Sequence, residues 1–503
     1  MQNSTVFAKH LRERTAGTSA ARILLIGIGP HARRTYIPHV ALLSETRPVK
    51  LCAGVDIEAN EISLRAWAVD QGMREELFFV PAFTTLMPAW VELDLDRLVE
   101  RHGINAVIIS TEPLSHKAYA MWALSRGLHI MMDKPITTRA AAVCDVDQAR
   151  GIEQDIKDLL CAYRISQASG TDTCFIINSH RRFHPGFSKV IACIEEIRDK
   201  TGCPVTSISS THCDGQWRLP SEIVTQDYHS YNQGYGKVSH SGYHIIDSVY
   251  RFLKAGLVPA KTPDTMEMFS SFVQPDGFLH QLGEGDYLRI FGEDYSSVRR
   301  FQEKELRAVF SRFGEMDAKA LVTFRKAGAA VCQAQIDLKH NGFARRTWLR
   351  PGDDLYKGNG RVKHERHEIQ SGPFQTVLIE SYQSRDKHDQ CGPGDFEVGG
   401  NNHFDIHVFR NCGITGDDAP LETWKLSDLA ETDGYDDGRL YTEQVKEAGL
   451  VEFVRCVEGS LPKSDLSSNI EDHLISAQMM SAMYVSHVLG RRGEHPVVSH
   501  AIF

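Results

Sequence analysis

Residues 23–32 read Ile23-Leu24-Leu25-Ile26-Gly27-Ile28-Gly29-Pro30-His31-Ala32, an apolar run that passes directly into a glycine-rich turn. The run is short and apolar, as a strand covered on both faces should be. The turn has the spacing G-x-G-x-x-A between a predicted strand and a predicted helix, which is the context of a dinucleotide-binding loop. The expected cofactor contacts in this turn are Gly27, Gly29, Pro30, His31 and Ala32.

The turn has a physical reason for each small residue. Gly27 permits the tight turn, Gly29 lets a pyrophosphate approach the backbone, and Ala32 allows the helix to pack closely on the strand. The N-terminus of the following helix attracts the phosphates. Because the same spacing also occurs in ordinary glycine-rich turns, the motif needs support from the rest of the chain.

Further apolar runs of the same kind follow, and helical patterns separate them. One helical pattern, over His116–Arg126, is ended by Gly127, and Thr138 is a suitable N-cap for a long helix from Arg139 to about Ala168. The alternation predicts an α/β domain with a parallel, doubly wound Rossmann sheet over residues 21–178, after a polar tail of residues 1–20. Besides Ile23–Ile26, the predicted strands are Leu51–Val55, Phe78–Val80, Ala106–Ser110, His129–Met132 and Cys174–Asn178.

Asp56 ends the second predicted strand, 24 residues after Ala32. A carboxylate at this place accepts hydrogen bonds from the adenine ribose hydroxyls and repels a 2′-phosphate. The next residues, Ile57, Glu58 and Ala59, include no Arg or Lys that could pair with that phosphate. NAD is therefore favoured over NADP, although Asp56 has the alternative reading of an ordinary turn residue at a strand end.

Several polar groups follow the C-terminal ends of predicted strands. They are the glycine turn, Asp56, Ser110-Thr111 and Asp133-Lys134. In a parallel sheet these ends share one edge, so we expect all four groups to face one crevice. Pro135 pushes Lys134 into an extended conformation, which presents the lysine at the rim of the sheet.

The pattern of apolar runs and turn residues changes after about residue 179. Apolar runs are separated there by clusters of Gly, Asn, Asp and Pro, which predicts a second α+β domain over residues 179–440 with a large, mostly antiparallel open sheet. Residues 351–400 are polar and indicate an insertion or an elaborated hairpin. Residues 441–489 return to helical periodicity, within a C-terminal segment 441–503 that should pack on the core. The predicted strands are Val205–Ser210, Asp286–Phe291, Ala320–Arg325, Ala330–Leu338 and His403–Arg410.

Composition argues against several classes of protein. The net charge is −9 without a basic block, so nucleic acid is not an expected partner. No apolar run approaches the roughly 20 residues of a membrane helix, and the first 20 residues lack the apolar core of a secretory signal. The 11 cysteines include no C-x-x-C pair, which favours reduced thiols in a cytoplasmic protein without a metal site.

Motifs beyond the glycine turn resemble the Gfo/Idh/MocA oxidoreductase family. The resemblance covers residues 22–255 well and residues 441–489 weakly, whereas residues 256–440 match only as a generic sheet. The usual family motif Glu-Lys-Pro is Asp133-Lys134-Pro135 here, a difference of one methylene. The motifs that carry the resemblance are Ile26-Gly27-Ile28-Gly29, Ser110-Thr111-Glu112-Pro113-Leu114-Ser115-His116, Ala123-Leu124-Ser125-Arg126-Gly127-Leu128-His129, Asp133-Lys134-Pro135, Arg182-Phe183-His184-Pro185 and the stretch from Gly234 to Asp247.

The resemblance implies an NAD-dependent enzyme that transfers a hydride between the nicotinamide and a CH–OH group of a sugar, sugar derivative or cyclitol. It also implies a homodimer or homotetramer that assembles through the open face of the second sheet. Lys134 and His244 fall on the catalytic positions, and His240 stands where the family usually has an aspartate. The remaining expected contacts are Ser110, Thr111, His116, Asp133 and Lys134 with the cofactor, and Arg182, His184, Tyr228, His240 and Asp247 with the substrate.

The residue chemistry agrees with these implied roles. Oxidation of a CH–OH group needs a hydride acceptor and a base for the hydroxyl proton. Lys134 can hold the hydroxyl, and desolvation lowers the pKa of a lysine toward neutrality. His244 can relay a proton at physiological pH. Tyr228 lies in a polar stretch, residues 227–232, that either lines a sugar-like pocket or forms a surface loop.

His240 leaves the exact activity open. It lies four residues before His244, which puts both imidazoles on one face of a helix. Either the proton relay passes through two histidines, or ordinary dehydrogenation is impaired. The family resemblance leaves two other functions open: a glycosidase that oxidises its substrate transiently on tightly bound NAD, and a regulator that senses the dinucleotide without turnover.

Two further groups of histidines have weaker interpretations. His403, Asp405 and His407 alternate along a predicted strand and share a face, so they could bind a metal, although such a face is usually only solvated. His364 and His367 belong to a charged stretch that we expect to be exposed.

Overall fold

The fold is that of a computed structural model, which describes residues 20–350, 360–385, 392–430 and 441–503. Within this part the chain forms two compact units. The first contains the chain up to Thr138 together with Glu153–Phe183 and Thr442–Leu474, and the second contains Arg139–Ile152, His184–Tyr441 and Ile475–Phe503.

The first unit contains a parallel sheet of six strands in the order β3-β2-β1-β4-β5-β6. Every neighbouring pair in it is parallel. This is the strand order of a dinucleotide-binding Rossmann fold, which confirms the predicted class. The strands are β1 (Ala21–Ile26), β2 (Val49–Ile57), β3 (Glu76–Val80), β4 (Ala106–Ile109), β5 (His129–Asp133) and β6 (Phe175–Asn178).

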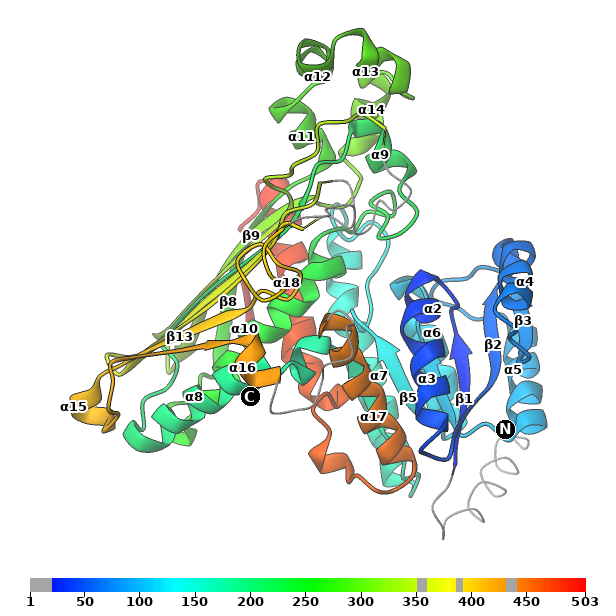
Figure 1. Cartoon of the computed structure of the whole chain (residues 1–503), viewed down its shortest axis with the longest axis horizontal. Coiled ribbons are helices and arrows are strands. Elements are labelled where there is room, and N and C mark those ends of the chain that lie inside the picture. Colours follow the sequence, from blue (N-terminus) through cyan, green and yellow to red (C-terminus); the bar gives the residue numbers. More distant parts are fainter. Residues whose placement is uncertain (1–19, 351–359, 386–391, 431–440) are drawn as a thin grey trace. The chain divides into compact units, whose positions relative to one another are not determined.

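Helices enclose this sheet, whose first strands appear in blue in Figure 1. Side chains of β1 and β4 share one hydrophobic core with Tyr36 and Val40 of α3, Leu64 of α4 and Phe453 of α17. Because β1 and β4 are buried on both faces, their sequences are continuous apolar runs. The helices of this unit are α2 (Pro30–Arg34), α3 (Tyr36–Ser44), α4 (Glu61–Asp70), α5 (Ala89–His102), α6 (Pro113–Ser125) and, for most of their length, α7 (Val146–Ala168) and α17 (Tyr441–Val457).

The helix predicted from Arg139 begins later, at Val146, as α7 (Val146–Ala168). The preceding backbone N–H groups bind another segment instead of a helix. Ala141 N donates to Gln233 O at 2.8 Å, and Val143 N donates to Gly234 O at 3.0 Å. Ala141 has φ 61°, a left-handed conformation that a helix cannot contain. The predicted start was therefore wrong.

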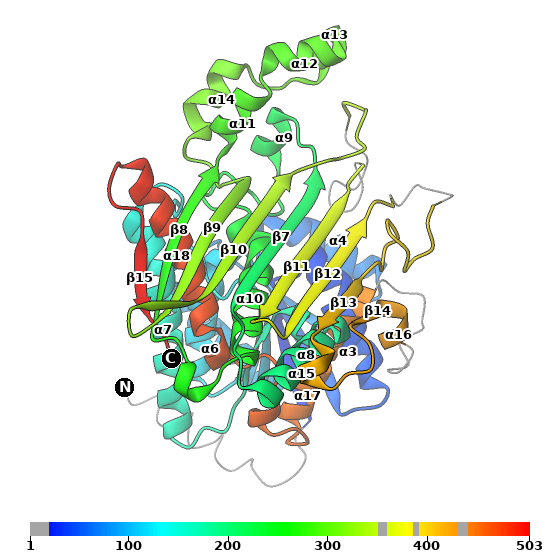
Figure 2. The same cartoon turned by 90° about the vertical axis from the view of Figure 1, so that its left-hand side faces the viewer.

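The second unit is built on a nine-stranded sheet, shown face-on in Figure 2, in the order β14-β13-β12-β11-β7-β10-β9-β8-β15. Only β7 and β10 pair in parallel among these strands, so the predicted mostly antiparallel sheet is confirmed. The strands are β7 (Ser207–Gln216), β8 (Thr265–Val273), β9 (Asp317–Lys326), β10 (Ala329–Asn341), β11 (Lys363–Ser371), β12 (Gln375–Gln383), β13 (Asp405–Arg410), β14 (Leu421–Lys425) and β15 (Val498–Ala501).

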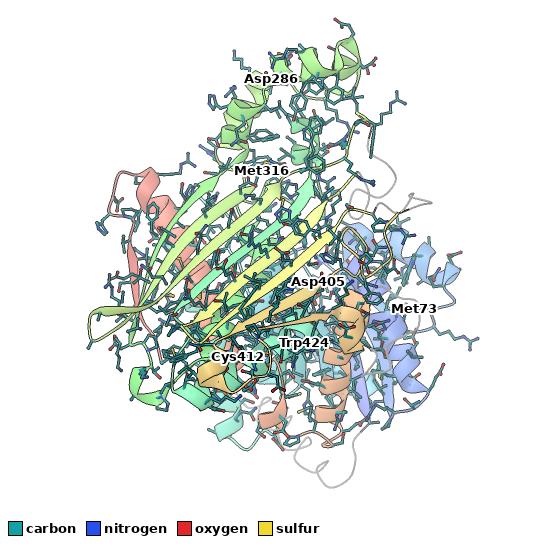
Figure 3. All side chains as sticks on the ribbon, turned by 60° about the vertical axis from the view of Figure 1, so that its left-hand side comes forward. Met73, Asp286, Met316, Asp405, Cys412 and Trp424 are labelled. Atoms are coloured by element: carbon teal, nitrogen blue, oxygen red, sulfur yellow. The ribbon has the colours of Figure 1, made fainter. Side chains whose placement is uncertain are left out.

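The two faces of this sheet differ. Helices α8 (Pro185–Thr201), α10 (Tyr243–Ala255) and most of α18 (Leu474–Arg491) cover one face. The other face is open: Lys319 and Leu321 of β9 are exposed, whereas Ala320 and Val322, which alternate with them along the strand, are buried. Figure 3 shows side chains standing on the strands, with Asp405 and Trp424 labelled on neighbouring strands β13 and β14.

A group of short helices continues beyond one end of the sheet. Figures 1 and 3 show it, with Asp286 labelled in the helices and Met316 near the start of β9. The strand predicted over Asp286–Phe291 is wrong, since these residues lie in α12. Tyr287 and Tyr295 stack with their ring centroids 4.8 Å apart and form a small core there. The helices are α9 (Pro220–Thr225), α11 (Pro275–Gln281), α12 (Glu284–Phe291), α13 (Glu293–Val298) and α14 (Glu303–Phe310).

The polar stretch 351–400 is largely a hairpin of the sheet. Strands β11 and β12 pair in antiparallel register from Lys363↔Gln383 to Ser371↔Gln375, while residues 351–359 and 386–391 lie outside the described part. The C-terminal segment is divided between the units, because α17 belongs mainly to the first and most of α18 to the second. Of the helices that the structure describes, none is long and apolar enough to cross a membrane.

Candidate functional site

The glycine turn of the first unit leaves open space at its second glycine. A Cβ at Gly29 would meet no atom within 4 Å, whereas a Cβ at Gly27 would lie 2.5 Å from Ser110 O. Gly27 also has φ 90°, which L side chains rarely adopt. Pro30 occupies the first turn of α2, where its missing N–H costs nothing. The turn therefore suits the close approach of a pyrophosphate to the backbone.

Asp56 is locked at the end of β2. Its Oδ2 accepts the N–H of Ile28 at 2.7 Å, which ties β2 to the glycine turn. Its Oδ1 accepts the N–H of Ile57 and the Nδ2 of Asn60, both at 2.8 Å. Each carboxylate oxygen can accept more than one hydrogen bond, so the fixed side chain retains capacity for a ribose hydroxyl.

Asp133 connects the C-terminal ends of several strands of the first unit. Its Oδ2 accepts the Ser110 hydroxyl at 2.6 Å, and its Oδ1 accepts the Tyr36 hydroxyl and lies 3.6 Å from His31 Nε2. Burial opposes its charge, but His31, Ser110 and Tyr36 together hold the pKa of Asp133 well below its usual value. These contacts of Asp133 therefore fix the strand end that carries Lys134.

His116 holds the loops behind this edge. Its ring is fully buried, with Nδ1 2.9 Å from Pro135 O and Nε2 3.1 Å from Thr111 O. Burial lowers the pKa of His116 below its ordinary value. Both ring nitrogens face backbone carbonyls, so this side chain bridges the loop at Thr111 and the loop at Pro135. Lys134, which directly precedes Pro135, is half-buried.

The stretch from Gly234 to Asp247 is the glycine element of the second unit. It contains a π-helical turn over Val238–Gly242, which runs into α10. His240 lies in this turn and His244 in the first turn of α10, and both are buried. Gly242 N donates to Lys237 O at 2.8 Å, the wide spacing that defines a π turn. Such turns occur frequently at functional sites.

Glu315 holds this turn from outside. Its Oε1 accepts the Val238 N–H at 2.7 Å and the Tyr484 hydroxyl at 2.9 Å, and its backbone oxygen accepts the Lys237 N–H at 2.8 Å. A Cβ at Gly236 would lie only 2.2 Å from Glu315 O, which explains the glycine there. Burial raises the pKa of Glu315 to about 7.

Lys237 forms a buried ionic cluster beside the turn. Its side chain is 0% exposed, and its Nζ lies 2.6 Å from Asp214 Oδ2, 2.7 Å from Ser241 Oγ and 2.9 Å from His212 Nδ1. Burial opposes the charge on Asp214, but Lys237 and His340 hold the pKa of Asp214 well below its usual value. Burial also lowers the pKa of Lys237. All three hydrogens of a charged Lys237 thus have acceptors.

Aromatic rings surround His240. The His229 ring stacks on it with the centroids 4.6 Å apart and an interplanar angle of 10°, while Tyr231 and Tyr235 present edges at 5.4 and 5.6 Å. The Tyr231 hydroxyl lies 2.8 Å from His340 Nδ1. His240, at the position where the family usually has an aspartate, is therefore surrounded mainly by the rings of histidine and tyrosine side chains.

Three of the predicted substrate-contact residues make polar contacts within the protein. Arg182 is buried, and its Nη1 binds Asp472 Oδ2 at 2.8 Å, so it anchors a neighbouring segment. His184 caps α8 by accepting the Gly186 N–H at 3.1 Å, and Asp247 accepts the Ser476 hydroxyl at 3.0 Å. All three side chains are therefore held in place by contacts within the protein, and their contact with a substrate stays a prediction. Tyr228, by contrast, is 38% exposed.

The weaker histidine groups do not form a metal site. His403 Nε2 lies 3.3 Å from Asp405 Oδ2, whereas His407 Nδ1 bonds Thr423 Oγ1 at 3.1 Å. Nowhere in the described ranges do three His, Cys, Asp or Glu side chains gather as metal ligands. The expected exposure of His367 was wrong, because its ring is buried and its Nε2 lies 2.9 Å from Glu365 Oε1.

Sequence reasoning missed the cluster of Lys237 and Asp214. The signal was present in β7, where polar side chains alternate at Ser210, His212 and Asp214 and are all directed to the covered face. The predicted strand ended at Ser210, before the alternation was visible. A lysine inside the glycine element was the second signal.

Known proteins support the class that the fold and the turn define. Residues 21–151 match the model of the Gfo/Idh/MocA family, an oxidoreductase family with an NAD-binding Rossmann fold. Over this range the resemblance to that family is confirmed, and an NAD-using enzyme of the oxidoreductase class is supported. Among curated proteins, no match to the chain was found.

Solved structures share the fold over nearly the whole chain. An oxidoreductase domain protein from Kribbella flavida has a TM-score of 0.57 at 16% identity, covering 96% of this chain and 100% of that one. The WlbA dehydrogenase from Bordetella pertussis, in complex with NADH and UDP-GlcNAcA, has 0.54 at 13%, covering 97% and 99%. The aldose-aldose oxidoreductase from Caulobacter crescentus, complexed with glycerol, has 0.52 at 13%, covering 96% and 100%. At these identities the likeness establishes the fold.

Proposed function

We propose that the protein transfers a hydride between NAD and a CH–OH group of a sugar, sugar derivative or cyclitol. The observation that carries the proposal is the locked edge of the first sheet. There the open glycine turn, Asp56 and the Asp133-anchored Lys134 all follow parallel strands. The nicotinamide supplies the hydride acceptor when NAD is bound. The relatives crystallised with UDP-GlcNAcA and glycerol support a polyhydroxylated substrate.

In this proposal the protein supplies orientation and proton transfer. Lys134 binds the reacting hydroxyl and takes part in moving its proton, because a lysine amine can both donate a hydrogen bond and exchange a proton. His244 accepts or returns the hydroxyl proton, since imidazole exchanges protons near neutral pH. Two observations support His244: it lies in the glycine element, and it stands on α10 directly after the π turn that Glu315 binds.

The proposal is tested by following NADH absorbance while purified protein and NAD are mixed with sugars, cyclitols and glycosides. We expect net NADH formation with at least one polyol. Product release without NADH would instead favour the redox-assisted glycosidase, the second candidate. Dinucleotide binding with no turnover of any compound would favour a regulator and contradict both enzymes.

Asp56→Ala should weaken the preference for NAD over NADP by about tenfold. The reason is that the carboxylate can no longer accept ribose hydroxyls or repel the 2′-phosphate, and a hydrogen bond to a charged group is worth roughly 1.5–3 kcal/mol. The measurement is the ratio of the two dissociation constants by fluorescence titration. Glu58→Ala, a neighbouring exposed carboxylate, is the control and should leave the ratio unchanged. Unchanged discrimination in Asp56→Ala would remove the ribose assignment.

We also propose that the open face of the second sheet joins copies of this chain, as a dimer or tetramer. Phe269 of β8 and Leu321 of β9 are direct cross-strand partners on that face and remain 43% and 58% exposed. Adjacent exposed apolar side chains favour association. The proposal includes a cytoplasmic location, which rests on the spacing of the cysteines in the sequence.

Light scattering should therefore give a mass of at least twice the 56.4 kDa of one chain. Leu321→Glu places a charge in the contact and should lower that mass. Ile62→Glu is the matched control, because Ile62 is 88% exposed on α4 of the other unit. A wild-type mass of one chain would contradict the assembly.

A further inference from the structure

Three rings form a stack in the second unit. The Tyr228 ring lies 4.1 Å from the His229 ring at an interplanar angle of 24°, and His229 lies 4.6 Å from His240 at 10°. Two rings this close and nearly parallel to His229 would collide if they lay on the same face. His229 is therefore sandwiched, with Tyr228 on one face and His240 on the other.

The loop that carries this stack is held in an unusual conformation. His229 has φ 53°, a left-handed conformation that is uncommon for residues other than glycine. The side chain of Gln226 holds it there, since its Nε2 donates to Tyr228 O and to His229 O, both at 2.8 Å. Backbone strain that surrounding contacts maintain occurs most often at functional sites.

The outer ring of the stack remains accessible. Tyr228 is 38% exposed, while His240 at the inner end is buried. The loop carries one formal charge, Asp227, and neither Lys nor Arg between residues 226 and 232. A ligand that stacks here should therefore be flat and uncharged, because Asp227 would repel a phosphate group.

We propose that Tyr228 is the stacking platform of a subsite for a neutral aromatic ring linked to the sugar or cyclitol, so that the substrate is an aryl glycoside. This inference rests on the proposed function and adds the class of substituent that the substrate carries. An aromatic ring stacks on another in an offset parallel arrangement, which the existing stack already adopts. The base of a nucleotide sugar offers the same ring but brings a diphosphate toward Asp227.

The test measures binding without turnover. Calorimetry and saturation-transfer NMR would compare 4-nitrophenyl and methyl glycosides of glucose, galactose and N-acetylglucosamine, together with UDP-glucose, in the presence of NAD. The wild-type protein should bind one aryl glycoside about three- to tenfold more tightly than its methyl partner, the range that one aromatic pair supplies.

Two variants make the comparison specific. Tyr228→Ala should abolish the preference for the aryl compound, whereas Tyr228→Phe keeps the ring and should retain the preference. Unchanged NAD affinity and thermal unfolding would show that both variants are folded. Equal binding of aryl and methyl partners, an unaffected Tyr228→Ala, or tighter binding of UDP-glucose than of every aryl glycoside would each overturn the proposal. The experiment measures binding alone, so a failure to detect hydride transfer would not change what it shows about the stacking subsite.

Discussion

Replacing Lys237 by methionine should destabilise the second unit by roughly 3 kcal/mol, the low end for breaking a buried ion pair. Methionine fills a similar volume, so the loss comes from charge. Asp214 would keep its carboxylate in the interior after losing the partner at 2.6 Å. Arg361, whose Nη2 lies 3.4 Å from Asp214 Oδ1, still compensates part of the charge, which is why we expect the low end.

The measurement is the midpoint of thermal unfolding by calorimetry, which should fall by roughly 5 °C. Lys339→Met is the matched control on β10, because Lys339 also pairs with an aspartate, Asp337 at 3.0 Å, but is one-third exposed. A partly exposed pair contributes little, so this variant should change the midpoint by only a degree or two. The double variant Lys237→Met with Asp214→Asn should recover stability, since no charge remains unpaired between them. Equal midpoints for Lys237→Met and the control would contradict a charged pair.

Lys134→Ala should lower turnover of the true substrate by about 10²–10⁴-fold, the range for loss of a positioned acid–base group. NAD affinity should change by less than about threefold, because in the proposed function the phosphates and ribose bind the glycine turn and Asp56. Steady-state rates and NADH fluorescence titration measure the two effects separately.

Lys134→Arg is the informative companion to the alanine variant. Arginine keeps the positive charge but remains protonated at all accessible pH values, so it can bind the hydroxyl but cannot exchange its proton. We expect the arginine variant to bind substrate nearly normally and to turn over as slowly as the alanine variant. Full activity in Lys134→Ala would show that another residue performs the role.

The parts of the fold that follow from local patterns were predictable. The run from Ile23 to Ile26, the turn at Gly27 and the strand end at Asp133 each carry their own signal of apolar periodicity or glycine spacing. Because a parallel sheet places its strand ends at one edge, the grouping of Asp56, Ser110 and Asp133 also followed from the sequence.

The parts that depend on distant contacts were not predictable. Lys237 meets Asp214 and His212 of β7 only because the fold brings this strand beside the π turn. Residues 286–291 read Asp-Tyr-Leu-Arg-Ile-Phe, rich in the aromatic and apolar side chains that strands favour, yet they form a helix. The overlooked signal was the cap in which Gly283 N donates to Asp286 Oδ2 at 3.0 Å.

The division of the chain between the units governs the order in which the protein can fold during synthesis. Phe453 and its neighbours in α17 complete the same core as Ile23 and Leu25 of β1. More than 400 residues separate these partners, so the dinucleotide domain cannot finish its interior until almost the whole polypeptide has left the ribosome. A truncation anywhere before α17 would therefore expose the core of the N-terminal domain, and neither unit can be obtained as one uninterrupted fragment.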